Sequence, residues 1–145
     1  MIAIDTNILV YAHRQEMQWH ISATRCVREL AEGSGPWALP WQCVHEFLAV
    51  ITNPKIWRTP TPQETAVRQI ADWLESPTVV LLNEGPLHWG SLTEILSASR
   101  VVGPRVHDAR IFAICKQHGV STLWSADRDF SRFAGLKVVN PLIGR

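Results

Sequence analysis

Short apolar runs that lack helical periodicity alternate with amphipathic segments along the chain. Runs of this kind are typical of strands buried on both faces, and such strands belong to parallel sheets that are covered by helices. The pattern therefore predicts an α/β fold, a three-layer α/β/α sandwich around a central, mainly parallel sheet of about five strands. The expected strands are residues 2–4, 37–39, 79–82, 121–124 and 137–139, and the expected helices are residues 8–12, 20–32, 41–51, 61–74, 87–97 and 107–118.

Two helix ends carry recognisable signals. Thr61, Pro62 and Glu64 have the form of a capping box with proline at the first helical position, which predicts that a helix begins there. Gly119 follows the last expected helix and is predicted to close it, because glycine accepts the left-handed conformation that ends many helices.

The composition limits the classes of protein to which the chain can belong. Its 145 residues suffice for one domain, expected over residues 1–145, with a core that needs no disulfide. Apolar residues make up 46% and charged residues 19%, which argues against a disordered chain. The net charge of +1 excludes a strongly basic nucleic-acid coat, so any affinity for nucleic acid must come from local patches or a metal.

The cysteines and the aliphatic runs bear on the location of the protein. The three cysteines form no Cys-x-x-Cys pair, which disfavours a disulfide framework and a zinc ribbon and fits a reduced, cytoplasmic protein. The longest aliphatic run, residues 79–82, is far too short to cross a bilayer, so we expect no membrane partner.

Acidic side chains collect where the predicted strands end. Only five aspartates occur; Asp5 follows the first strand, and Asp127 and Asp129 follow the fourth. Asp108 begins the apolar face of the last helix, where a carboxylate is costly unless it is paired or bound to a cation. Because ligands of open α/β sheets bind at the carboxyl ends of the strands, these acids are expected near a functional site.

Each acid also has an ordinary structural role open to it. Asp5 could cap a helix, and Asp108 could be an N-cap or a first-turn acid that satisfies the helix dipole. Asp127 and Asp129 could be turn residues. Glu46, taken alone, has the position of a solvated surface acid, because its helical row lies away from the main apolar stripe.

Taken together, four motifs resemble those of the PIN-domain ribonucleases, and among these the VapC-type toxins of bacterial type II toxin–antitoxin systems. They are residues 4–9 (Ile-Asp-Thr-Asn-Ile-Leu), Glu46, residues 107–109 (His-Asp-Ala) and residues 123–130 (Leu-Trp-Ser-Ala-Asp-Arg-Asp-Phe). The resemblance covers nearly the whole chain and implies a PIN-like fold. It departs from the family at Ser125, where the family often carries threonine and a hydroxyl is still present.

The resemblance also implies an activity and a set of catalytic residues. Asp5, Glu46, Asp108 and Asp127 would form an acidic pocket that holds Mg²⁺ or Mn²⁺. RNA would be cut endonucleolytically by in-line attack of a metal-activated water, leaving a 5′-phosphate and a 3′-hydroxyl. A cognate antitoxin would inhibit the enzyme, and a homodimer is expected.

Further residues are expected around this pocket. Thr6, Asn7 and Ser125 could orient carboxylates or a phosphate, with helix capping as the other role of Thr6 and Asn7. Four arginines could contact RNA phosphates or could be ordinary surface residues: Arg14, Arg105, Arg110 and Arg128. Trp19 and Trp57 lie in polar surroundings, where packing or a protein interface is commoner than stacking on unpaired bases.

Other functions stay open at the level of sequence. A metal-dependent phosphatase or phospho-acceptor domain would use Asp5 as a covalent nucleophile, although such enzymes usually carry a second aspartate where Asn7 stands. A non-catalytic PIN-like interaction module would keep the fold without the chemistry. Asp129 could replace Asp127 as the fourth acid.

Overall fold

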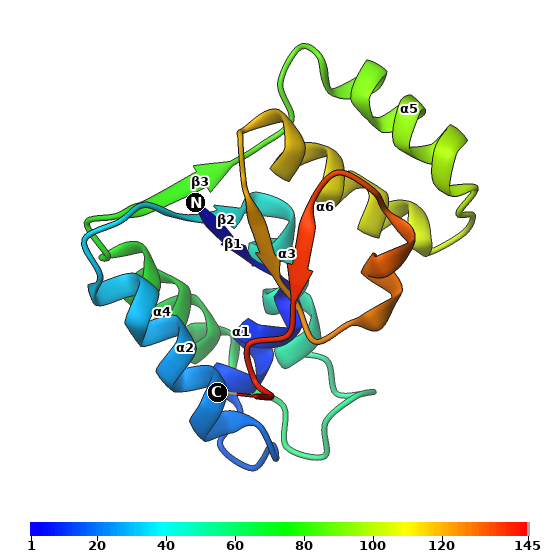
Figure 1. Ribbon diagram of the computed structural model, residues 1–145. Coiled ribbons are helices and arrows are strands. Elements are labelled where there is room, and N and C mark those ends of the chain that lie inside the picture. The colour runs from blue at the N-terminus through cyan, green and yellow to red at the C-terminus, as the bar shows by residue number, and fades with distance from the viewer. Residues whose placement is uncertain (145) are drawn as a thin grey trace.

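A single five-stranded sheet organises the molecule, which we describe from a computed structural model over residues 1–144 (Figure 1). The strand order is β3-β2-β1-β4-β5, and every neighbouring pair is parallel. The strands are β1 (Ile2–Ile4), β2 (Trp37–Pro40), β3 (Val79–Leu82), β4 (Thr122–Trp124) and β5 (Lys137–Val139). The predicted α/β/α fold with a parallel sheet of five strands is confirmed.

Helices cover both faces of this sheet. Right-handed crossovers place the helices between β1 and β3 on one face and those between β3 and β4 on the other. Figure 1 shows α2 and α4 on one side of the sheet, and α6 with α5 outside it on the other. The helices are α1 (Thr6–His13), α2 (His20–Glu32), α3 (Trp41–Ile51), α4 (Gln63–Leu74), α5 (His88–Ser99) and α6 (Arg105–Gln117), followed by a short 3₁₀ helix, η1 (Arg128–Arg132).

The core fills the space between the sheet and its helices. The central strand β1 contributes Ala3 and Ile4, both fully buried, and β2 is buried along its whole length. Among the helices, α6 buries the longest apolar face, which includes Phe112 and Ile114. Continuous apolar strands are what a parallel sheet covered on both faces requires, and they account for the apolar runs of the sequence.

One of the two predicted helix ends differs from the structure. The capping box at Thr61 does not form: α4 begins at Gln63, its cap residue is Pro62, and that cap has no side-chain hydrogen bond. The hydroxyl of Thr61 is instead bound by His13 and Arg14 from the end of α1. Gly119 has a left-handed φ of 69° directly after the C-cap of α6, as predicted.

No helix within residues 1–144 is both long enough and apolar enough to cross a bilayer.

Candidate active site

Asp5 stands at the carboxyl end of the central strand and caps the helix that follows. Its Oδ1 accepts a hydrogen bond of 2.8 Å from the backbone N–H of Thr6, so the expected capping role is confirmed. The residue is only 4% exposed. Burial raises the pKa of Asp5 from 3.8 to about 6; hydrogen bonds from Ser125 and Thr6 oppose that rise, and the nearby Glu46 and Asp108 add to it.

A polar network joins the ends of β1 and β4, which are neighbours in the sheet. The hydroxyl of Ser125 donates to Asp5 Oδ2 at 2.7 Å, and the amide of Asn7 donates to the same oxygen at 2.9 Å. Asn7 Oδ1 accepts from the backbone N–H of Ala126 at 3.0 Å, and Ser125 Oγ accepts from that of Asp127 at 3.0 Å. The network therefore fixes the Asp5 carboxylate and the turn that carries Asp127.

Glu46 reaches this region from the middle of α3. Its Oε2 accepts from the hydroxyl of Thr6 at 2.8 Å, and its Oε1 accepts from Gln42 Nε2 at 3.0 Å. The solvated role that its helical row suggests is therefore not what the structure shows, since Glu46 is half-buried and held by two donors.

Gln42 is a residue that the sequence analysis missed. It is 4% exposed, and its amide also donates to the backbone carbonyl of His107 at 3.2 Å, which ties α3 to the first turn of α6. Its Oε1 is buried with no hydrogen-bond partner among the described residues. The signal was its spacing of four residues from Glu46, which places both side chains on one helix face.

Arg105 bridges the aspartates that come from α6 and from the turn after β4. Its Nη1 donates to Asp108 Oδ2 at 2.9 Å and to Asp127 Oδ2 at 3.3 Å, and its Nη2 pairs with Asp129. Asp127 also caps η1, since its Oδ1 accepts from the backbone N–H of Asp129 at 2.8 Å. Burial raises the pKa of Asp108, while Arg105 opposes that rise and the neighbouring acids Asp127 and Glu46 add to it.

All four predicted acids line one cavity of about 320 Å³ at the carboxyl edge of the sheet. Its walls are completed by apolar side chains that the sequence analysis did not assign to the site, among them Tyr11, Met17 and Val50. Thr6 and Asn7 also line it, whereas Ser125 lies beneath it, buried against Asp5. Asp129 is not among the lining residues; Phe130 next to it is buried in the core.

The electrostatics of this cavity suit a cation with oxygen ligands. Four carboxylates from four separate segments face one space, and their mutual repulsion contributes to the raised pKa of both Asp5 and Asp108. Carboxylate oxygens are the ligands that Mg²⁺ prefers. Within residues 1–144, no group of three acidic, histidine or cysteine side chains is already arranged closely enough to hold a metal ion. Arg105 supplies positive charge to Asp108 and Asp127 in this arrangement.

The other three predicted arginines lie outside the cavity. Arg110 pairs with Glu84 from the loop before α5. Arg128 is exposed and lines a separate hollow on the far side of Asp127. Arg14 lies at the end of α1 and lines a larger cavity with the loop before α4. Of the predicted cations, only Arg105 contacts the carboxylates of the acidic cavity.

Solved structures share this fold. The structure of VapBC2 from Rickettsia felis, bound to a DNA fragment from its promoter, contains a chain that matches with a TM-score of 0.71 and 17% identity, covering 96% of this chain and 98% of that one. VapC20 of Mycobacterium tuberculosis, a toxin that cleaves the sarcin–ricin loop, matches with a TM-score of 0.65 and 17% identity over 90% and 93% of the two chains.

Sequence comparisons agree with the fold. The sequence model of the PIN domain matches residues 2–136. The VapC ribonuclease Mb2897 of Mycobacterium bovis is 31% identical over 145 residues, covering 100% of this chain and 98% of its own. Ribonuclease VapC48 of Mycobacterium tuberculosis is 30% identical over 140 residues, or 97% of each chain. The chain therefore belongs to the PIN domain family and, within it, to the VapC ribonucleases.

Proposed function

We propose that this protein is a Mg²⁺-dependent endoribonuclease, the toxin of a toxin–antitoxin pair, and that Asp5, Glu46, Asp108 and Asp127 hold the metal. The observation that carries the proposal is the convergence of these four carboxylates on one cavity. Membership of the VapC ribonucleases supports RNA as the substrate. Mn²⁺, which also takes oxygen ligands, is the expected substitute for Mg²⁺.

The residues around the acids keep them in place. Asn7 and Ser125 hold Asp5 Oδ2, so that the carboxylate keeps one orientation. Thr6 does the same for Glu46 through a hydrogen bond of 2.8 Å. Such partners of a ligating carboxylate preserve its geometry and its charge, and their removal weakens metal binding.

The chemistry that a bound Mg²⁺ supplies is the activation of water and the neutralisation of charge on the phosphate. The chain contributes the placement of the RNA. Arg105 is part-exposed at the rim of the cavity, beside Asp108 and Asp127. A guanidinium there can bind a phosphate group through two parallel N–H···O hydrogen bonds. The expected products are a 5′-phosphate and a 3′-hydroxyl.

Two partners belong to this proposal. A cognate antitoxin is expected to block the acidic cavity, and the VapBC2 complex of Rickettsia felis is the neighbour that motivates this expectation. A homodimer and a cytoplasmic location also stay predictions; sedimentation of the purified chain and cell fractionation test them.

Cleavage of total bacterial RNA tests the proposal. The wild-type protein should produce discrete fragments with Mg²⁺ or Mn²⁺ and none with EDTA, and Asp108→Asn should be inactive. The matched control is Asp72→Asn, which makes the same change on the exposed face of α4 and should cleave like the wild type. Equal cleavage by the Asp108 variant and the wild type would overturn the assignment of the site.

The same preparation separates the two alternatives. Asn7 stands where such phosphatases usually carry a second aspartate, and this argues against Asp5 as a phosphatase nucleophile. A trapped aspartyl-phosphate on Asp5 would favour the phosphatase. Binding of RNA without cleavage, at saturating metal, would favour a non-catalytic module.

A further inference from the structure

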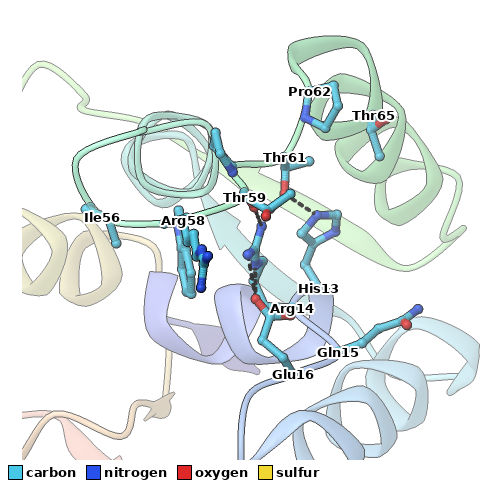
Figure 2. Close-up of a pocket in the computed structure, with 12 residues that line it drawn as sticks. His13, Arg14, Gln15, Glu16, Ile56, Arg58, Thr59, Thr61, Pro62 and Thr65 are labelled. Carbon is cyan, nitrogen blue, oxygen red and sulfur yellow. Dashed lines mark hydrogen bonds and ion pairs between the residues drawn. The ribbon is translucent and has the colours of Figure 1, made fainter.

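A second and larger cavity, of about 710 Å³, lies beside the C-terminal end of α1. Figure 2 shows His13 and Arg14 on the α1 side, Ile56 and Arg58 on the side of the loop between α3 and α4, and Thr65 at the start of α4. We call it the loop cleft. The proposed function does not use it.

The inner wall of the loop cleft is built by Arg14. Its Nη1 donates to the carbonyl of Thr59 at 2.9 Å and to the hydroxyl of Thr61 at 3.1 Å, and its Nε donates to Glu16 at 2.7 Å. The guanidinium also lies 4.1 Å from the ring centre of Trp57. With 11% of its side chain exposed, Arg14 holds the loop in place and has little capacity left for a ligand.

The rest of the loop is fixed by the same kind of contact. The indole N–H of Trp57 donates to the carbonyl of Val50 at 2.8 Å. One ring nitrogen of His13 lies 3.1 Å from the hydroxyl of Thr61, and the other lies 3.0 Å from Gln69 on α4. The loop is therefore anchored to α1 and α3, and α1 in turn contacts α4, so the backbone that carries the outward side chains is held in place.

Those outward side chains are cationic and apolar. Arg58 is exposed and has no hydrogen bond or ion pair to any residue between 1 and 144. Lys55 is exposed as well, and Ile56 between them is 54% exposed. The sequence contains no acidic residue between Glu46 and Glu64. The outer side of the loop cleft therefore offers free positive charge beside apolar and aromatic surface.

The loop cleft adjoins the acidic cavity, because two residues that line the acidic cavity are hydrogen-bonded to residues that line the loop cleft. Val50, whose carbonyl holds Trp57, lines the acidic cavity, and so does Met17, whose N–H donates to the carbonyl of Arg14. Asp5 caps one end of α1 and Arg14 the other. Eight helical residues span about 12 Å, a distance covered by about three or four stacked nucleotides at 3.4 Å each.

We propose that the loop cleft binds a single-stranded stretch of RNA a few nucleotides away from the scissile bond. Arg58 pairs with a phosphate there, and Trp57 and Ile56 provide the surface on which an unpaired base packs. Single-stranded RNA is the occupant that fits, because its bases are free to contact apolar and aromatic side chains while its phosphates seek cations. This inference rests on the proposed ribonuclease function and extends it to the substrate outside the acidic cavity.

Binding of a fluorescein-labelled, randomised 20-nucleotide RNA tests this, measured by fluorescence anisotropy in EDTA across a range of salt concentrations. Arg58→Gln should weaken binding about five- to tenfold at low salt, and it should reduce the slope of log K against log salt by about 0.7, the loss of one phosphate contact. Arg58→Lys should restore most of the affinity. Because Arg58 has no side-chain partner among residues 1–144, these variants should keep the wild-type circular dichroism spectrum.

Lys137→Gln is the matched control, since it removes one exposed positive charge at the start of β5, the opposite edge of the sheet from the acids. It should bind RNA within twofold of the wild type. A pre-annealed duplex of the same length should bind more weakly than the single strand and should respond less to Arg58→Gln.

The outcomes separate this inference from the function on which it rests. If Arg58→Gln binds RNA with unchanged affinity and salt slope while the wild-type protein cleaves RNA, only the proposal that the loop cleft binds RNA is overturned. Loss of antitoxin binding in that variant, with RNA binding unchanged, would overturn it in favour of a protein interface. A wild-type protein that neither binds nor cleaves the RNA would overturn both proposals.

Discussion

Asp5→Asn should remove a pH dependence of stability from the metal-free protein. The folded state raises the pKa of Asp5 from 3.8 to about 6, chiefly by burial. The folded protein therefore binds this proton more tightly than the unfolded chain does, and its free energy of unfolding falls as the pH rises through that interval. At about 1.4 kcal/mol for each pH unit, the whole effect is about 3 kcal/mol. About 2 kcal/mol of it falls between about pH 4.5 and pH 8.

Asparagine also changes the hydrogen bonds of the site, but by an amount that does not depend on pH. Its amide nitrogen would face the donors of Asn7 and Ser125, which now bind Asp5 Oδ2, at a cost of about 1–3 kcal/mol. The informative quantity is therefore the difference in unfolding free energy between wild type and variant as a function of pH, not the stability of the variant at one pH.

Urea unfolding in EDTA at several pH values measures this difference. The wild type should lose about 2 kcal/mol relative to Asp5→Asn between about pH 4.5 and pH 8, while the exposed control Asp72→Asn should follow the wild type. Added Mg²⁺ should stabilise the wild type at pH 8 and have little effect on Asp5→Asn. Parallel pH profiles for wild type and Asp5→Asn would refute the argument that burial sets the charge of this group.

Three further outcomes are expected. Arg105→Gln should lower the Mg²⁺ concentration that half-saturates the thermal shift, because the guanidinium that pairs with the site's acids is gone; a higher requirement would contradict this. Phe47→Ala should lower the free energy of unfolding in urea by about 3–5 kcal/mol, since this fully buried ring packs edge-on against His13 and Trp73. A loss below about 1 kcal/mol would mean that the surrounding core collapses into the space left by the ring. All three cysteines are buried, and burial raises the pKa of Cys43 and Cys115. Cys26, Cys43 and Cys115 should therefore react with a thiol reagent only after unfolding, and rapid labelling of the native protein would show that the helices that carry them, α2, α3 and α6, open readily.

The fold could be predicted because its signals are local. Each strand is a short apolar run, and each helix repeats apolar residues along one face, so the periodicity marks both. The capping box at Thr61 failed for the opposite reason. Its hydroxyl is taken by His13 and Arg14, which lie 48 and 47 residues away, and a local window contains no sign of them.

The site could be predicted only in part. Asp5 and Asp127 follow strands that topology brings together, so their meeting at one edge of the sheet could be foreseen. Glu46 alone looked like a surface acid, because its partner Thr6 lies 40 residues away. The engagement of Arg14 within the loop cleft, and the freedom of Arg58, depend on how side chains turn in three dimensions, which the sequence does not specify.

The place of β1 in the sheet has a consequence for the chain as it is being made. One neighbour of β1 is β2, but the other is β4, which begins at Thr122, 118 residues after β1 ends at Ile4. Until β4 leaves the ribosome, the carboxylate of Asp5 lacks Ser125, and Asp127 has not been presented at all. A nascent chain therefore cannot bring the four carboxylates of the proposed site together until β4 and the turn that follows it have been translated.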